Sequence, residues 1–87
     1  LQLNLVTRVV PKDELEAQTQ KLATKLAASA PQALRGMLDA ILVAGESPLD
    51  AGLEFETQAF AVTFSTEDMR EGTGAFLARR PATFTGR

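Results

Sequence analysis

The 87-residue sequence contains no cysteine and no histidine. Without cysteine, the chain has no disulfide scaffold, no thiolate metal site and no cysteine nucleophile. Without histidine, it lacks the usual proton shuttle of enzymes and the commonest protein ligand for metal ions. We therefore expect no metal site, and none of the catalytic residues that act through these side chains.

Strong net charge and long apolar runs are also missing. The net charge is −2, which gives no general reason to expect nucleic-acid binding. The apolar run 40–45 is far too short to cross a bilayer, and the first residues lack the basic region and apolar stretch of a signal peptide. We expect a cytoplasmic chain that binds neither nucleic acid nor membrane.

The remaining composition is that of an ordinary globular protein. Hydrophobic residues make up 45% of the chain and charged residues 23%, which argues against disorder. The length allows one domain at most. A domain of this size buries only about 60–65% of the surface of its unfolded chain, so its stability is marginal without help.

The first residues have the pattern of a strand. Residues 3–10 are apolar, rich in β-branched side chains and followed by Pro11. No second strand is predicted in the chain, so the backbone donors and acceptors of this one would stay unpaired. The segment must pair with something outside the sequence or fray.

Helix-start signals predict an all-α fold of four helices after this strand-like segment. Asp13 opens a capping box, Pro31 suits a first helical position, and Ser65 or Thr66 caps the last helix. The helices are expected at about residues 13–29, 31–44, 48–64 and 67–80. The tail after Pro81 is predicted to be extended or turning.

Two of these helices carry more apolar surface than their neighbours can cover. The helix at 31–44 is apolar around most of its circumference, and the helix at 48–64 has two apolar faces. A helix that is apolar nearly all round must be buried on several sides. The pattern predicts contact with a further body of protein or with other copies of the chain.

Residues 60–87 read FAVTFSTEDMREGTGAFLARRPATFTGR. This stretch resembles the C-terminal region of the crotonase superfamily (enoyl-CoA hydratase/isomerase). In that region a helix with an S/T-x-D-x-R-E-G start runs into A-F, a basic pair and F-x-G. Upstream stretches 5–11, 13–15 and 33–35 agree in order and spacing. The resemblance covers only the family's C-terminal third, so we expect a piece of a longer enzyme whose catalytic body precedes Leu1.

The resemblance implies a division of the chain. Residues 1–11 would be the end of a core spiral domain that is otherwise absent. Residues 12–87 would be the C-terminal helical domain, which in the family builds oligomer contacts and covers the acyl-CoA site. It implies a trimer or a dimer of trimers for the parent enzyme, and we expect a dimer or higher oligomer for the 87-residue chain.

The resemblance also implies an activity for the parent enzyme. The expected reaction, in fatty acid metabolism, adds water to a trans-2-enoyl-CoA through an enolate stabilised by an oxyanion hole. Coenzyme A enters as part of the acyl-CoA substrate, with no bound cofactor. Isomerase, hydrolase and decarboxylase reactions stay open. The family's catalytic glutamates lie upstream of this chain, so we expect no catalytic residue and no activity in the 87-residue chain alone.

The candidate coenzyme A-binding residues are Phe60 and Arg79. In the family, the first base of the pair contacts the nucleotide end of coenzyme A, and an aromatic on the preceding helix lies near the adenine. From the residues alone, a cation in a last helical turn is explained by the helix dipole. Phe60 shares a stripe with Leu53 and Phe64, so a core position is equally open.

The acidic residues of this region are predicted to be structural. Glu67 and Glu71 lie four residues apart on one helix face. Paired carboxylates become catalytic only where burial or crowding raises one pKa, and these lie in a polar first turn beside Arg70. Capping and salt bridges are the favoured roles. A competing hypothesis for the whole chain is a free-standing helical homo-oligomerisation or adapter module without enzymatic activity.

Overall fold

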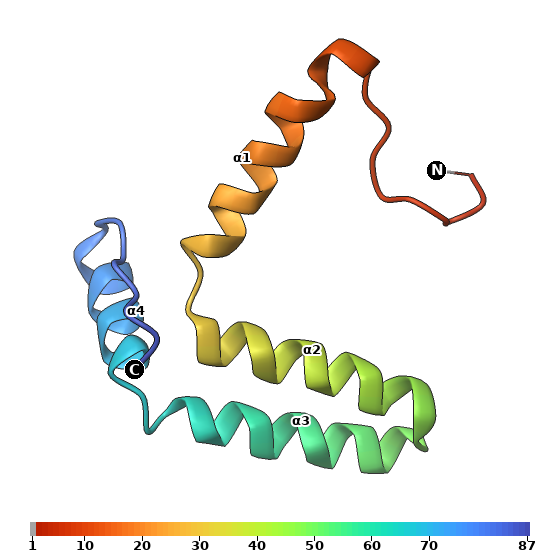
Figure 1. Cartoon of the computed structure of the whole chain (residues 1–87). Helices are drawn as coiled ribbons and strands as arrows, with labels where there is room; N and C mark the ends of the chain where they lie inside the picture. The colour runs from red at the N-terminus through yellow and green to blue at the C-terminus, as the bar shows by residue number, and fades with distance from the viewer. Residues whose placement is uncertain (1) are drawn as a thin grey trace.

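The structure, a computed structural model, describes residues 2–87. It contains a short 3₁₀ helix, η1 (Lys12–Glu14), and four α-helices, α1 (Leu15–Ala27), α2 (Pro31–Glu46), α3 (Leu49–Thr63) and α4 (Glu67–Ala78). Figure 1 shows their arrangement. The all-α fold expected from the sequence is confirmed, because every regular element of the described chain is helical.

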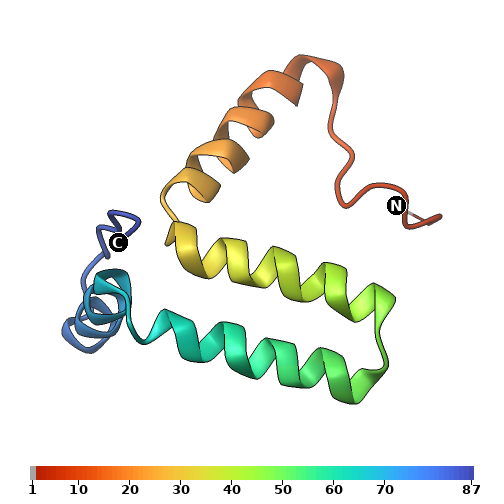
Figure 2. The same ribbon diagram turned by 60° about the horizontal axis from the view of Figure 1, so that its bottom comes forward.

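Helices α2 and α3 form an antiparallel pair that lies side by side in both ribbon views (Figures 1 and 2). Pro31 occupies the first position of α2, as predicted. Small residues let the two helices approach closely. A Cβ added to Gly36 would lie 3.7 Å from the Cβ of Ala59, and one added to Gly52 would lie 3.7 Å from the Cα of Ala44.

Helix α1 and the residues before it extend away from this pair (Figure 1). The radius of gyration is 16.3 Å, whereas a compact domain of this length has about 12 Å. The extents are 43 × 38 × 19 Å, and the smallest is roughly the diameter of two α-helices. The chain is therefore a thin, open layer of helices.

At the start of the chain, the strand-like segment takes the frayed alternative, and the expected cap is wrong. Residues 3–10 form turns, bends and irregular backbone instead of a strand, because the described chain offers no second strand to pair with. Asp13 does not cap α1. The N–H of Glu14 donates to the carbonyl of Pro11 at 3.0 Å, so a 3₁₀ turn containing Asp13 leads into the helix in place of a side-chain cap.

The start of α4 follows the prediction, and its end does not. Of the two candidate caps, Thr66 is the one used, and its hydroxyl accepts the N–H of Met69 at 3.1 Å. The helix ends at Ala78, two residues early, because Arg79 adopts the left-handed conformation with φ of 54°. The N–H of Arg80 then donates to the carbonyl of Ala75 at 3.0 Å, which reverses the chain.

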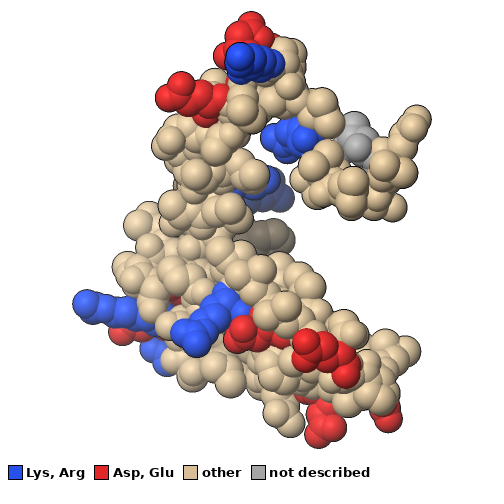
Figure 3. All heavy atoms as spheres, turned by 45° about the vertical axis from the view of Figure 1, so that its right-hand side comes forward, with Lys and Arg blue, Asp and Glu red and all other residues tan. Residues whose placement is uncertain are grey.

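Very little of the described chain is buried. Ala75 is the one buried apolar residue between positions 2 and 87, and α1, α2 and α3 contain no buried residue. On α2, Ile41 is 62% and Leu42 67% exposed. Figure 3 shows a broad surface without charged side chains on one side of the molecule. Within residues 2–87, no helix is long and apolar enough to span a membrane.

Candidate functional site

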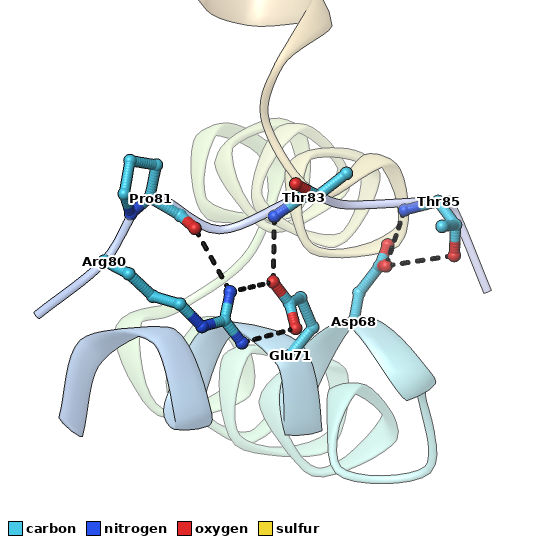
Figure 4. A network of polar contacts seen from close by, with 6 residues as sticks. All are labelled: Asp68, Glu71, Arg80, Pro81, Thr83 and Thr85. Atoms are coloured by element: carbon cyan, nitrogen blue, oxygen red, sulfur yellow. Dashed lines mark hydrogen bonds and ion pairs between the residues drawn. The ribbon is translucent and has the colours of Figure 1, made fainter. Parts of the chain in front are cut away.

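The buried residues of the described chain lie on α4, against which the C-terminal tail, residues 81–87, is docked. Asp68, in the first turn of α4, is 4% exposed. Its Oδ1 accepts the N–H of Thr85 at 2.8 Å and its Oδ2 accepts the N–H of Gly86 at 2.8 Å. The N–H of Asp68 donates to the carbonyl of Arg87 at 2.9 Å. This first-turn carboxylate thus holds the tail, and Figure 4 shows its contact with Thr85.

Glu71 fixes the tail one turn further along α4. Nη1 and Nη2 of Arg80 donate to its two carboxylate oxygens at 2.7 and 3.0 Å, and the N–H of Thr83 donates to its Oε1 at 3.0 Å. Figure 4 shows this cluster, with a further bond from Arg80 to the carbonyl of Pro81. We call Glu71, Arg80 and Thr83 the tail clamp. The salt bridge predicted for Glu71 exists, but its partner is Arg80 and not Arg70.

The electrostatics of the tail clamp stabilise the charged form of both side chains. The hydrogen bonds from Arg80, and then that from the Thr83 N–H, lower the pKa of Glu71 to about 2. The same contact raises the pKa of Arg80. Glu71 is therefore a carboxylate at any physiological pH, and it cannot act as a general acid.

Two glycines make room for the tail. A Cβ at Gly72 would lie 3.2 Å from the ring of Phe84, tighter than most side-chain contacts. Gly86 has φ of 83°, a conformation that favours glycine, and a Cβ there would lie 3.4 Å from the ring of Pro31. The close packing at Gly72 is therefore against the C-terminal tail.

Arg79 differs from Arg80 in its surroundings. It directly follows α4 and is exposed. It forms no ion pair with any residue of the described chain, whose salt bridges are Arg80 with Glu71 and Arg35 with Asp39. Arg79 is the C-terminal capping residue of α4, so its charge also lies at the helix end that the dipole favours for a cation. The side chain of Arg79 is free to meet an anion.

Phe60 is not a core residue of this chain. It is 64% exposed, and its ring meets that of Phe64 edge to face, with the centroids 5.1 Å apart. Phe60 lies in the last turns of α3, whereas Arg79 follows the far end of α4. The 12 residues of α4 span ~18 Å. The structure therefore does not bring the two predicted residues into contact, and any shared ligand would have to be long.

Phe60 also lines a groove along the α2–α3 pair. The groove has a volume of about 580 Å³, and its lining is largely apolar, with Met37, Ile41 and Leu53 among its members. Glu56 is the one charged residue in that lining. Such a surface can cover an apolar group, but it offers no acid–base pair. Within residues 2–87, no three acidic side chains group in a way that could hold a metal ion.

Comparison with known proteins now decides the family. A family model described as enoyl-CoA hydratase/isomerase matches residues 1–87. This chain belongs to the enoyl-CoA hydratase/isomerase family. Among curated relatives, the 2,3-dehydroadipyl-CoA hydratase of Escherichia coli is 40% identical over 86 residues, which is 99% of this chain and 34% of the relative.

Solved structures of the same family share the fold of this chain. An enoyl-CoA hydratase subunit from Geobacillus kaustophilus superposes with a TM-score of 0.92 at 41% identity, over 99% of this chain and 34% of that one. An enoyl-CoA hydratase from Bacillus anthracis gives a TM-score of 0.93 at 34% identity, over 99% and 33%. The chain thus spans about a third of the length of these family members, and it corresponds to a helical portion of their fold.

Membership of the enoyl-CoA hydratase/isomerase family explains the open shape of the molecule. Its helices match those of longer proteins closely, although they bury almost nothing within the described chain. The tail docked on α4 went unpredicted, since Asp68 and Glu71 read as ordinary first-turn acids. The available signals were Gly72 within α4 and Phe84 near the end of the chain.

Proposed function

We propose that this chain is the C-terminal helical part of an enoyl-CoA hydratase, an enzyme that adds water to a trans-2-enoyl-CoA through an oxyanion-stabilised enolate. Residues 1–11 are then the end of the core domain, and residues 12–87 the helical domain. A cytoplasmic location belongs to the same proposal. The observation that carries it is the family match along the whole chain.

The role of this part is to supply oligomer contacts and a portion of the coenzyme A pocket. The exposed faces of α2 and α3 support the first role, because Leu38 and Leu42 are not part of the groove lining and are 57% and 67% exposed. Burial of such side chains contributes about 1.5–3 kcal/mol each. The unpaired Arg79 and the exposed Phe60 support the second role.

The positions of the carboxylates support the proposal that the catalytic groups lie in another part of the enzyme. Asp68 and Glu71 are engaged by the tail, and Glu56 lines the groove as a single acid. None of these arrangements pairs two carboxylates for acid–base work. The catalytic glutamates and the oxyanion hole belong, in this proposal, to the core domain.

The complete reading frame tests the proposal. We expect a frame that continues upstream of Leu1 in the same phase and encodes a core domain with its glutamates. A start codon at Leu1 would contradict the enzyme and favour the second candidate, a helical homo-oligomerisation or adapter module. The exposed apolar faces of α2 and α3 fit that candidate as well, because they need partners in either case.

Assembly can be tested on the protein itself. We expect a dimer or higher oligomer for the 87-residue chain and a trimer or dimer of trimers for the complete enzyme. Leu42→Glu places a charge on the outer face of α2 and should lower the molar mass measured by light scattering. Arg35→Glu introduces the same side chain at an exposed charged position of α2, next to Asp39, and should leave the mass unchanged. A monomeric wild-type chain at high concentration would contradict the assembly role.

A further inference from the structure

Two adjacent arginines at the end of α4 have different roles in the structure. Arg80 is held by both carboxylate oxygens of Glu71 and is 48% exposed. Arg79 lies next to it, exposed and without an ion pair among residues 2–87. A basic pair therefore presents only one free guanidinium to a ligand.

The backbone at Arg79 is fixed from both sides. On one side, its N–H donates to the carbonyl of Phe76 at 3.2 Å, within the last turn of the helix. On the other side, Arg80 is attached to Glu71 by two charge-assisted hydrogen bonds. The left-handed conformation of Arg79 is unfavourable for a residue with a Cβ, so it needs such support from its surroundings.

We infer that Glu71 is a positioning residue for Arg79, and that the tail clamp directs the Arg79 guanidinium to the phosphates at the nucleotide end of coenzyme A. This inference rests on the proposed function. By engaging Arg80, Glu71 holds the reversed chain that carries Arg79. Arg80 in turn neutralises Glu71, so that no free carboxylate stands beside the phosphate site.

A clamp of this kind lowers the cost of binding. A guanidinium on a mobile tail must be ordered when the ligand arrives, whereas one on a held tail is already in place. The contacts of Thr83 and Thr85 with α4 continue the same support along the tail. Loss of the clamp should therefore weaken binding of the nucleotide end specifically, and leave the acyl end unaffected.

The experiment uses the complete enzyme and two substrates, an enoyl-CoA and the corresponding enoyl-pantetheine, which lacks the nucleotide and its phosphates. The kcat and KM are measured for wild type, Arg79→Ala and Glu71→Gln. Glu67→Gln is the matched control, because Glu67 lies on the same helix and forms no ion pair within residues 2–87. Arg80→Gln removes the other partner of Glu71 and serves as a second variant.

Arg79→Ala should raise the KM for the enoyl-CoA about tenfold, as expected for loss of one charge-assisted contact. Glu71→Gln and Arg80→Gln should raise it roughly three- to tenfold through lost preorganisation. All three should leave kcat and the enoyl-pantetheine kinetics unchanged. In the Arg79→Ala background, Glu71→Gln should add nothing.

The experiment distinguishes a failure of the proposed coenzyme A contact from a failure of the positioning role of Glu71. If Arg79→Ala leaves the KM for the enoyl-CoA unchanged, the proposed coenzyme A contact is wrong. If Arg79→Ala raises this KM while Glu71→Gln behaves like Glu67→Gln, the contact stands and the positioning role is overturned. Equal losses for both substrates in Glu71→Gln would mean a general structural role, which also overturns the inference.

Discussion

Removal of the Asp68 carboxylate should release the C-terminal tail from α4. Asp68 is 4% exposed and accepts the backbone N–H groups of Thr85 and Gly86, each at 2.8 Å. A hydrogen bond to a charged acceptor contributes roughly 1.5–3 kcal/mol. Both bonds share one carboxylate charge, so their contributions do not simply add, and we expect Asp68→Ala to lower the free energy of tail opening by about 2–3 kcal/mol.

Hydrogen–deuterium exchange measures this opening directly. A loss of about 2–3 kcal/mol corresponds to roughly 30- to 150-fold faster exchange, and it should be seen at the amides of Thr85 and Gly86. Asp68→Asn keeps one acceptor oxygen and should give an intermediate rate. Asp50→Ala is the control, because exposed Asp50 accepts only the N–H of the next residue. Exchange in Asp68→Ala within threefold of wild type would refute the reasoning.

Two further predictions concern the same tail. The pKa of Glu71 is lowered from 4.5 to about 2, so the stability that the tail clamp contributes is fully present above pH 4.5 and is lost as the pH falls toward 2. The protection of the tail amides against exchange should fall over that window in wild type and fall less in Glu71→Gln, in which the contacts of Asp68 remain; equal profiles would contradict the linkage. Gly72→Val should speed tail exchange, because the ring of Phe84 lies only 3.2 Å from an added Cβ. Gly74→Ala, with open space around it, should stabilise α4 by ~1 kcal/mol; a destabilising Gly74→Ala, or a silent Gly72→Val, would count against this packing.

The sequence predicted those features of the fold that depend on neighbouring residues. Pro31 starts α2 because proline has no N–H to leave unpaired at the first helical position. Thr66 caps α4 because its hydroxyl accepts a free N–H of the first turn. Both effects act within one turn of the residue itself. The end of α4 was misplaced, since the reversal at Arg79 depends on the tail behind it. Glu71 and Arg80 are nine residues apart, a spacing that no helical periodicity relates.

Structural features that depend on residues far away in the sequence, or outside it, could not be predicted from local patterns. The β-branched composition of residues 3–10 is typical of a strand, but a strand requires a neighbour, and the described chain contains none. The candidate residues Phe60 and Arg79 came from the family resemblance and not from their local pattern. The structure adds that Phe60 and Arg79 are exposed, and that Arg80 forms an ion pair with Glu71.

The central claim is that these helices belong to a hydratase whose catalytic groups lie in another part of the protein. Its most direct test is the hydration of crotonyl-CoA, measured in parallel for the complete protein and for the purified 87-residue chain. We expect turnover by the complete protein and none by the chain. Turnover by the chain alone, or an inactive complete protein that is folded and binds coenzyme A, would contradict the account.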